Sequence, residues 1–383
     1  MTTGDGKIEC KIDGARVHSI QVHIKKNHAA EWSVARYQAE FPGEPLLSDL
    51  AKKAVRERED AAAAKTETLA GDRKNLSEVF GIPHAKTMSP RKTPITVGIF
   101  SEASEEAAVF IPDVDPNYIF NIELLKSVLI GYELNKTVYL HGLHGSGKTT
   151  LLEQVAARTK RPFLRLQHTI NTEEAHILGQ WTVKDGETVF SLGPLPMAMQ
   201  MGLIYCADEY DFALPSVTSV YQPALEGKPL MIKDAPPEMR VIRPSKNFRF
   251  VATGNTNGCG DETGLYQGTQ IQNAANYSRF AITEEVEYPE EKVETAIVSG
   301  QSGIRMEEAG KLVQFAAEVR KLFRGGQISS TVSPRELINA GFLGSVRGGD
   351  WRAGLRMAFT NRLSRTDREV CSQFAQRLFG GAA

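Results

Sequence analysis

One stretch of the sequence decides the fold: Gly142-Leu143-His144-Gly145-Ser146-Gly147-Lys148-Thr149. It fits the phosphate-binding loop pattern G-x-x-x-x-G-K-[ST]. The apolar run 137–140 before it predicts a strand, and the apolar spacing of residues 151–156 after it predicts a helix. Glycines let the backbone N–H groups of such a loop point at an anion, and the helix N-terminus adds partial positive charge. The stretch therefore predicts a site for nucleotide phosphates.

The side chains of this loop predict how the nucleotide is held. Lys148 would reach the β- and γ-phosphates, and the hydroxyl of Thr149 would bind Mg²⁺. We therefore expect ATP and Mg²⁺ as cofactors. The residues expected to bind ATP belong to the loop and the first helical turn: Gly142, His144, Gly145, Ser146, Gly147, Lys148, Thr149 and Thr150.

An acidic pair predicts that the nucleotide is hydrolysed as well as bound. The apolar run 203–207 is typical of a central strand, and Asp208 and Glu209 follow at its carboxyl end, where open α/β sheets bind their ligands. Asp208 would hold Mg²⁺ through water, and Glu209 would polarise the attacking water. A third predicted strand, 248–253, is followed by Asn255, whose side chain could sense the γ-phosphate and orient water.

The loop, the acidic pair and the Asn-bearing strand together resemble the AAA+ ATPases. Three further segments are similar to one family of the MoxR-like branch, the ATPase subunits of aerobic cobaltochelatase, called CobS: residues 111–116, 207–211 and 260–270. The likeness runs from about Asn75 to the C-terminus. It implies an α/β P-loop core, with a parallel sheet flanked by helices, followed by a C-terminal helical lid.

The resemblance also implies an activity and partners. The chain is expected to be an ATP-hydrolysing motor that drives ATP-dependent insertion of cobalt into a corrin ring in cobalamin biosynthesis. It would form a homo-oligomeric ring, a hexamer as is usual for the family. It would work with cobaltochelatase-type partner subunits, one of which bears an integrin-like metal-site domain. Two alternatives stay open: a MoxR-type chaperone that remodels a different protein, and a non-enzymatic DNA-associated regulator.

Two arginines take roles from the same resemblance. Arg279 matches the arginine finger, which would enter the nucleotide site of a neighbouring subunit and neutralise charge in the transition state. The family usually has Asp before this arginine, whereas this chain has Ser278. Arg335 matches the sensor arginine of the lid, which would contact nucleotide within its own subunit. The alternative for either arginine is a solvated surface charge.

A β-hairpin is predicted between the P-loop helix and the acidic strand. Residues 181–190 alternate polar and apolar around the turn dipeptide Asp185-Gly186. In the MoxR-like branch, a hairpin at this place lies near the ring pore and the partner surface. The alternative is a decorative hairpin without such a role.

Composition argues against some classes of function. The 45 Lys and Arg residues balance 46 Asp and Glu residues to a net charge of −1, which gives no global attraction for nucleic acid or an anionic membrane. No apolar run approaches the ~20 residues that cross a bilayer, and the N-terminus is unlike a signal peptide. The four cysteines are scattered without disulfide spacing. We expect a cytoplasmic protein without membrane contact, for which nucleic acid is not a partner.

The first 50 residues contain a candidate zinc site. Cys10 and Asp13 resemble a C-x2-C knuckle whose second Cys has become Asp, and His23 and His28 have finger-like spacing. Together the four side chains could hold Zn²⁺, because a carboxylate oxygen is an acceptable fourth ligand, although the affinity should be lower than with two thiolates. The alternative is a small helical module without metal, with histidines on a wet helix face.

These observations divide the chain of 383 residues, for which length alone predicts about two to three domains, into four parts. Residues 1–50 form a small finger-like cap, 51–110 a helical and irregular linker, 111–288 the AAA+ α/β core, and 289–383 the helical lid. The lid is indicated by apolar residues at helical spacing from Leu312 onward.

Overall fold

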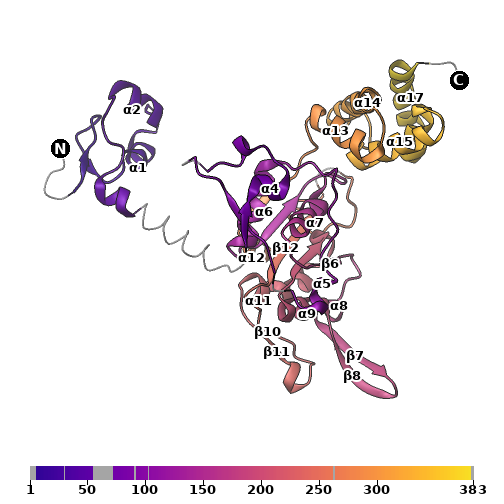
Figure 1. The fold of residues 1–383 in the computed structure, drawn as a ribbon, viewed down its shortest axis with the longest axis horizontal. Coiled ribbons are helices and arrows are strands. Elements are labelled where there is room, and N and C mark those ends of the chain that lie inside the picture. Colours follow the sequence, from indigo (N-terminus) through magenta and orange to yellow (C-terminus); the bar gives the residue numbers. More distant parts are fainter. Residues whose placement is uncertain are drawn as a thin grey trace. The chain divides into compact units, whose positions relative to one another are not determined.

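The computed structural model describes most of the chain and divides it into two compact units (Figure 1). The N-terminal unit comprises residues 1–70 and the main unit residues 71–383. The described residues are 6–29, 31–54, 72–89, 92–101, 103–261 and 264–380.

The N-terminal unit is a small module of short elements. Strands β1 (Ile8–Glu9) and β2 (Arg16–Val17) pair in antiparallel register. Helix α1 (Ile20–His23) continues directly into the π-helix η1 (Ile24–His28), and helix α2 (Val34–Glu40) follows. The strands and helices enclose a core of their own, made by Ile8, Cys10, Ile20, Ile24 and Tyr37.

A five-stranded parallel sheet, in the order β13-β5-β12-β9-β6, forms the centre of the main unit. Other elements cover both faces of this sheet. This explains why the inner strands are continuous apolar runs in the sequence, as expected for strands buried on both faces. The strands are β5 (Val138–His141), β6 (Phe163–Gln167), β9 (Ile204–Asp208), β12 (Arg249–Gly254) and β13 (Ile282–Glu285).

Successive side chains of each strand enter opposite hydrophobic clusters, as strand geometry requires. Val138 packs with helices α6 (Ile122–Glu133) and α7 (Lys148–Arg158), whereas Tyr139 packs with helix α9 (Pro194–Met201) on the other face. The sheet is therefore sandwiched between helices, which is the predicted α/β core.

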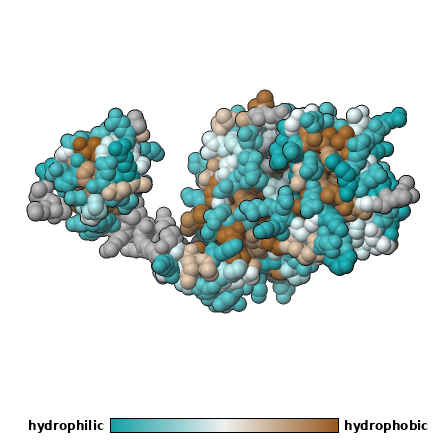
Figure 2. Space-filling model, turned by 90° about the horizontal axis from the view of Figure 1, so that it is seen from above, coloured by the Kyte–Doolittle hydropathy of each residue, from teal (hydrophilic) through white to brown (hydrophobic). Residues whose placement is uncertain are grey.

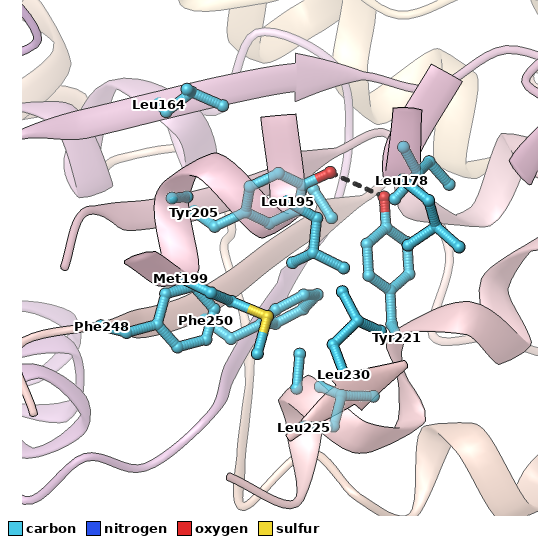
Figure 3. Close-up of a cluster of buried hydrophobic side chains, with 14 of the residues drawn as sticks. Leu164, Leu178, Leu195, Met199, Tyr205, Tyr221, Leu225, Leu230, Phe248 and Phe250 are labelled. Carbon is cyan, nitrogen blue, oxygen red and sulfur yellow. Dashed lines mark hydrogen bonds between the residues drawn. The ribbon is translucent and has the colours of Figure 1, made fainter. Parts of the chain in front are cut away.

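The cluster on the α9 side is rich in tyrosine (Figure 3). The hydroxyl of Tyr205 on β9 hydrogen-bonds that of Tyr221, at 2.8 Å, and the Tyr221 hydroxyl also lies 2.7 Å from Nε2 of His168. These contacts satisfy polar atoms that would otherwise be costly to bury.

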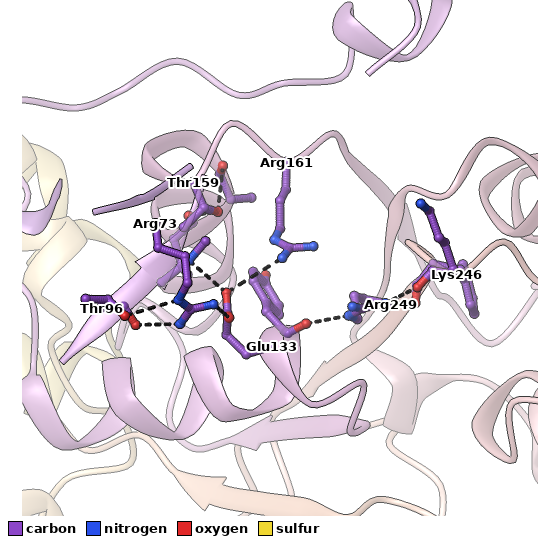
Figure 4. Close-up of polar contacts among 12 residues, drawn as sticks. Arg73, Thr96, Glu133, Thr159, Arg161, Lys246 and Arg249 are labelled. Atoms are coloured by element: carbon purple, nitrogen blue, oxygen red, sulfur yellow. Dashed lines mark hydrogen bonds and ion pairs between the residues drawn. The ribbon is translucent and has the colours of Figure 1, made fainter. Parts of the chain in front are cut away.

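Residues 72–101, predicted as part of an irregular linker, contribute buried side chains to the core. Strands β3 (Arg73–Asn75) and β4 (Thr96–Gly98) pair antiparallel, and helix α4 (Leu76–Phe80) packs its end residues into the α7-side cluster. Glu133 of α6 anchors the pair: it forms an ion pair with Arg73 at 2.8 Å and accepts the Gly98 N–H at 3.1 Å (Figure 4). The predicted helical segment at 51–64 lies outside the described residues beyond 54.

The predicted hairpin is confirmed. Strands β7 (Gly179–Lys184) and β8 (Glu187–Leu192) pair around the Asp185-Gly186 turn. A second, shorter pair, β10 (Leu230–Met231) and β11 (Val241–Ile242), lies beside it in Figure 1, and the Trp181 Nε1–H donates to the Asp234 carbonyl at 2.9 Å. The remaining short elements of the core are η2 (His84–Lys86), α5 (Glu105–Ala108), α8 (Glu174–Leu178), η3 (Tyr210–Phe212), α10 (Pro215–Thr218), η4 (Ser219–Tyr221), α11 (Gln222–Leu225), η5 (Pro237–Met239) and α12 (Ala274–Tyr277).

A helical lid follows the sheet and has a separate core. Its buried charge is paired: Arg320 contacts both oxygens of Glu294 at 2.7 Å, and its guanidinium lies 4.2 Å from the ring centre of Tyr288. The lid helices are α13 (Glu291–Ser302), α14 (Met306–Arg324), α15 (Pro334–Val346), α16 (Trp351–Ala358), η6 (Thr360–Arg362) and α17 (Arg365–Phe379).

Apolar side chains on the surface of the main unit gather in patches among polar ones (Figure 2). Phe342 and Val346, one turn apart on α15, are 57% and 71% exposed, and Val183 of the β7–β8 hairpin is 76% exposed. Such patches favour contacts with other chains. Among the described residues, no helix has the length and apolar content needed to cross a bilayer.

The lid ion pair generates a prediction about stability. Glu294 is fully buried, so Glu294→Gln would leave the charge of Arg320 inside the lid without its partner. We expect the free energy of unfolding of the lid to fall by about 3–5 kcal/mol. Hydrogen exchange of the α13 and α14 amides measures this locally. Glu291→Gln, an exposed change on the same helix, is the control, and equal protection in both variants would contradict the prediction.

Candidate nucleotide site

The P-loop connects β5 to α7 at the carboxyl edge of the sheet, as predicted. Gly142 and Gly145 have φ values of 140° and 68°, which only glycine adopts readily. A Cβ atom at Gly142 would lie 2.4 Å from the Val286 carbonyl oxygen, and one at Gly145 would lie 2.6 Å from Ser333 of the lid. The glycines therefore allow the loop to pass close to β13 and to the start of α15.

Lys148 is buried at the centre of this loop. Its Nζ donates to the carbonyls of Gly142 and Leu143 at 2.8 and 3.1 Å, and to Oδ1 of Asn255 at 3.2 Å. The structure thus brings the predicted γ-phosphate sensor next to the P-loop lysine. Burial lowers the pKa of Lys148 to about 8, against the opposing effect of the nearby carboxylates.

The predicted magnesium ligands are also together. The Thr149 hydroxyl donates to Oδ1 of Asp208 at 2.7 Å, and the Thr253 hydroxyl donates to the same oxygen. Arg165 on β6 holds the other oxygen, Oδ2, at 2.8 Å from Nε and 2.5 Å from Nη2. Hydroxyl and carboxylate oxygens are ligands that suit Mg²⁺, directly or through its waters. Sequence analysis missed Arg165, although an arginine inside an apolar strand was a usable signal.

Glu209 follows Asp208 with an unusual backbone. Its φ of 52° is left-handed, a conformation that costs a residue with a side chain about 1–3 kcal/mol. The Glu209 N–H donates to the Thr253 hydroxyl at 3.2 Å, and Gln167 Nε2 donates to Oε2 of Glu209 at 3.0 Å. Gln167 therefore holds the carboxylate predicted to activate water, a role that sequence analysis did not assign.

A third carboxylate of this turn, Asp211, organises the loop that carries Asn255. Its Oδ2 accepts the N–H groups of Asn255 and Thr256 at 2.9 and 2.8 Å and the Thr256 hydroxyl at 2.8 Å. Burial raises the pKa of Asp211, while these hydrogen bonds lower it. Sequence analysis included Asp211 in a motif but gave it no role.

The distinctive segment 260–270 contacts the P-loop through one tyrosine. The N–H of His144 donates to the Tyr266 hydroxyl at 2.8 Å, and the Tyr288 hydroxyl donates to the His144 carbonyl at 3.0 Å. His144 is therefore held from two sides, and burial lowers the pKa of its imidazole.

A cavity of about 850 Å³ lies between the P-loop and the lid, within the range of small-molecule sites. Its lining includes the P-loop residues Gly145 to Gly147, Thr150 and, from the lid, the predicted sensor Arg335. Gln301 and Asp115 also line it, and the amide of Gln301 donates to the carboxylate of Asp115 at 2.6 Å. The lining also contains apolar side chains suited to a flat base: Tyr118, Ile119, Val293, Ile297 and Ile338.

Comparison with known proteins decides the family. Residues 137–293 match the family model described as AAA domain (dynein-related subfamily), and residues 294–376 match the CbbQ/NirQ/NorQ C-terminal model. The chain is 34% identical to the aerobic cobaltochelatase subunit CobS of Sinorhizobium sp over 316 residues, which covers 80% of this chain and 90% of the relative. The chain belongs to the CobS family of AAA+ ATPases. It is therefore an ATP-hydrolysing enzyme that uses a nucleotide and Mg²⁺.

Two further likenesses are more distant. The chain is 30% identical to Protein NorQ of Paracoccus denitrificans (strain Pd 1222) over 206 residues, covering 54% of this chain and 72% of NorQ. Among solved structures, the RuvB Holliday junction branch migration motor of Thermotoga maritima covers 72% of this chain and 82% of its own, at 14% identity and a TM-score of 0.42.

Arg279, the predicted finger, lies apart from the nucleotide cavity of its own chain. It borders a separate hollow of about 450 Å³ next to the start of β5. Its Nε donates to Oε1 of Glu226 at 2.7 Å, and a second nitrogen, Nη1, donates to the Ala275 carbonyl. Arg279 is therefore not among the residues that line the nucleotide cavity of its own chain.

Three of the four candidate zinc ligands of the N-terminal unit form one group, and the fourth, His28, contacts Asp13 of that group. Oδ2 of Asp13 lies 2.9 Å from Nε2 of His23 and 3.0 Å from Nε2 of His28. The ligand atoms of Cys10, Asp13 and His23 all lie within 4.8 Å of one another. His23 is buried rather than on a wet helix face, and His18 instead contacts Ser48 at 2.9 Å.

The lowered pKa of Lys148 predicts a pH dependence of ATP binding. Phosphate oxygens favour the charged ammonium, so ATP must draw a proton onto Lys148 once the pH passes its free-protein pKa of about 8. We expect the affinity for ATP to be flat below about pH 7 and to fall by about tenfold per unit well above pH 8. Calorimetry should also detect proton uptake on binding above this pKa, in two buffers of different ionisation enthalpy.

Lys148→Arg is the matched control, because guanidinium stays charged throughout this range. Its affinity, although weaker, should not change with pH. A wild-type affinity that stays constant to about pH 9.5, without proton uptake, would contradict the assignment.

Proposed function

We propose that this chain is the motor subunit of a cobaltochelatase, using ATP hydrolysis to drive cobalt insertion into a corrin ring in cobalamin biosynthesis. The observation that carries the proposal is the hydrolytic set at the P-loop and the carboxyl end of β9, in a chain that aligns with 90% of a relative named as a cobaltochelatase subunit. This set comprises Lys148, Thr149, Asp208 and Glu209. Residues 260–270, quoted for the likeness to CobS, touch the P-loop through Tyr266, which further supports it.

Each side chain has a distinct task in this proposal. Thr149 and Asp208 hold Mg²⁺, which when bound neutralises charge on the β- and γ-phosphates. Lys148 binds the phosphates in place of the loop carbonyls that it contacts now. Glu209 polarises the attacking water, Asn255 orients it, and Arg335 contacts the nucleotide from the lid.

The motor works as a homo-oligomeric ring, a hexamer in this proposal, with ATP bound between subunits. The position of Arg279 outside its own cavity supports this arrangement, because a finger that acts across an interface must face away from its own nucleotide. The exposed apolar side chains Phe342 and Val346 supply surface of the kind that subunit contacts bury.

Cobalt and the corrin are substrates of partner subunits, one of which carries an integrin-like metal-site domain. The β7–β8 hairpin, with Trp181 and Val183 half or more exposed, is the surface that we assign to partner contact near the ring pore. We place the complex in the cytoplasm, in agreement with four cysteines that are all thiols rather than disulfides.

A MoxR-type chaperone acting on another protein is the second candidate. The match to NorQ and to the CbbQ/NirQ/NorQ C-terminal model favours it, because this branch shares the same ATPase residues. A DNA-associated regulator without enzymatic activity is disfavoured by the assembled hydrolytic set and by a net charge of −1.

The deciding experiment measures ATP hydrolysis and metal insertion together. The chain alone should hydrolyse ATP, and with cobaltochelatase partner subunits, corrin substrate and Co²⁺ it should insert the metal. Glu209→Gln should bind ATP normally but lose about 10²–10⁴-fold in turnover, and lose insertion with it. Hydrolysis without metal insertion would favour the chaperone function. Metal insertion by Glu209→Gln at the wild-type rate would contradict the proposal that ATP hydrolysis drives insertion.

We also propose that the N-terminal unit binds one Zn²⁺ through Cys10, Asp13, His23 and His28. The donor set fits a tetrahedral zinc site, in which neighbouring oxygen and nitrogen ligands stand roughly 3.3 Å apart, and both histidine nitrogens already lie near that distance from Asp13. On binding, His28 would move toward the group formed by Cys10, Asp13 and His23. The amide of Asn27 lies 2.9 Å from Nδ1 of His23. With its oxygen toward the ring, it would accept Nδ1–H and leave Nε2 for the metal.

Metal content tests the zinc proposal. The full chain should purify with, or take up, about one zinc per chain, and zinc should raise the melting temperature of the N-terminal unit. His28→Ala should lose the metal, whereas His18→Ala, whose imidazole contacts Ser48 instead, should retain it. Equal zinc content in the two variants would show that the metal lies elsewhere.

A further inference from the structure

The guanidinium of Arg279 is held by its own subunit at two of its three nitrogens. Nε donates to Glu226, which ends helix α11, and Nη1 donates to the carbonyl of Ala275 in α12. Within the described part of the chain, Nη2 has no hydrogen-bond partner. Because the five N–H donors of arginine lie in one fixed plane, holding Nε and Nη1 also fixes the direction of the two donors on Nη2.

The backbone beneath this side chain is fixed as well. The Thr137 hydroxyl donates to the Arg279 carbonyl at 2.9 Å and accepts the Ala281 N–H at 2.9 Å. Thr137 is buried and immediately precedes the central strand β5, which continues into the P-loop. The base of the arginine is therefore tied to the rigid sheet, and only its side chain needs a further constraint.

The charged side chains around Arg279 form a group whose net charge is positive. Oε2 of Glu226 pairs with Lys228 at 2.6 Å, while Oε1 holds Arg279. One carboxylate between two cations leaves the group with a net charge of +1, so Glu226 orients the guanidinium without cancelling its attraction for phosphate. These two bonds also lower the pKa of Glu226, and the carboxylate keeps its charge at neutral pH.

The residue before the arginine does not supply this carboxylate. Ser278 donates its hydroxyl to the Ala275 carbonyl at 3.0 Å and has no negative charge. Glu226 lies 53 positions away in the sequence and reaches Arg279 from another helix. The carboxylate expected next to the finger is thus replaced by one from a separate element.

We propose that Glu226 is a positioning residue that holds Arg279 ready for the nucleotide site of the neighbouring subunit. This inference rests on the proposed ring motor. An unrestrained arginine loses rotamer entropy when it engages a phosphate, and Glu226 removes part of that cost beforehand.

The test compares steady-state ATP hydrolysis by assembled rings. Glu226→Gln should lower kcat about tenfold, because a charge-assisted hydrogen bond is lost, with an unchanged KM for ATP, since the nucleotide cavity is untouched. Glu226→Asp should recover part of the loss. Glu238→Gln, an exposed change elsewhere on the surface, is the matched control and should equal the wild type.

Rings that contain two kinds of subunit show whether Glu226→Gln lowers ATP hydrolysis in the neighbouring subunit or in its own. Lys148→Ala subunits cannot use ATP but carry an intact Glu226 and Arg279. Added in excess to Glu226→Gln subunits, they should restore turnover per intact nucleotide site toward the wild-type value. Absence of rescue would place the defect within the subunit and overturn the proposal.

Arg279→Ala separates failure of this inference from failure of the proposed ring. Normal turnover in Arg279→Ala would show that Arg279 is not an arginine finger, and it would contradict this part of the proposed function. A large loss in Arg279→Ala with normal or raised turnover in Glu226→Gln would keep the finger and reject Glu226 as its positioning residue.

Discussion

The carboxylate of Asp208 is the group on which the nucleotide site depends. It receives the hydroxyls of Thr149 and Thr253 and the guanidinium of Arg165, which come from α7, β12 and β6. A buried carboxylate is costly unless such donors surround it. Four elements that are distant in the chain therefore meet on one side chain, at the edge where the parallel strands end. The contacts of Asp208 therefore connect these elements to one another and also fix the charged surroundings of the predicted Mg²⁺ site.

The turn after Asp208 gives neighbouring carboxylates separate tasks. Glu209 takes a left-handed backbone, and its carboxylate is held by Gln167. Asp211 returns to the interior, where it binds the N–H groups of the loop that carries Asn255. The strain at Glu209 is tolerated because both sides of the turn are held. In the proposed mechanism, one short segment thereby supplies the Mg²⁺ ligand Asp208, the water-activating Glu209 and, through Asp211, the support for Asn255.

Sequence analysis predicted the features whose information is local. The glycine pattern of the P-loop, the apolar run before Asp208 and the turn at Asp185-Gly186 each lie within about a dozen residues, and the structure contains all three elements. The sequence predicts a linker over residues 72–101, because prolines and short polar runs separate the few apolar residues and leave no helix or strand pattern. Only the fold shows that these side chains complete a cluster with α6 and α7, and that Glu133 holds the segment in place.

The same distinction applies to individual contacts. His23 and His28 are five positions apart on continuous helix, and Cys10 and Asp13 share one turn, so their spacing alone indicated a common site. Arg279 differs, because its guanidinium requires acceptors but nothing nearby in the sequence specifies them. The chain has 46 Asp and Glu residues, and only the packing of α11 beside α12 selects Glu226. A resemblance could therefore suggest which arginine is the finger, whereas the residue that aims it could be found only from the structure.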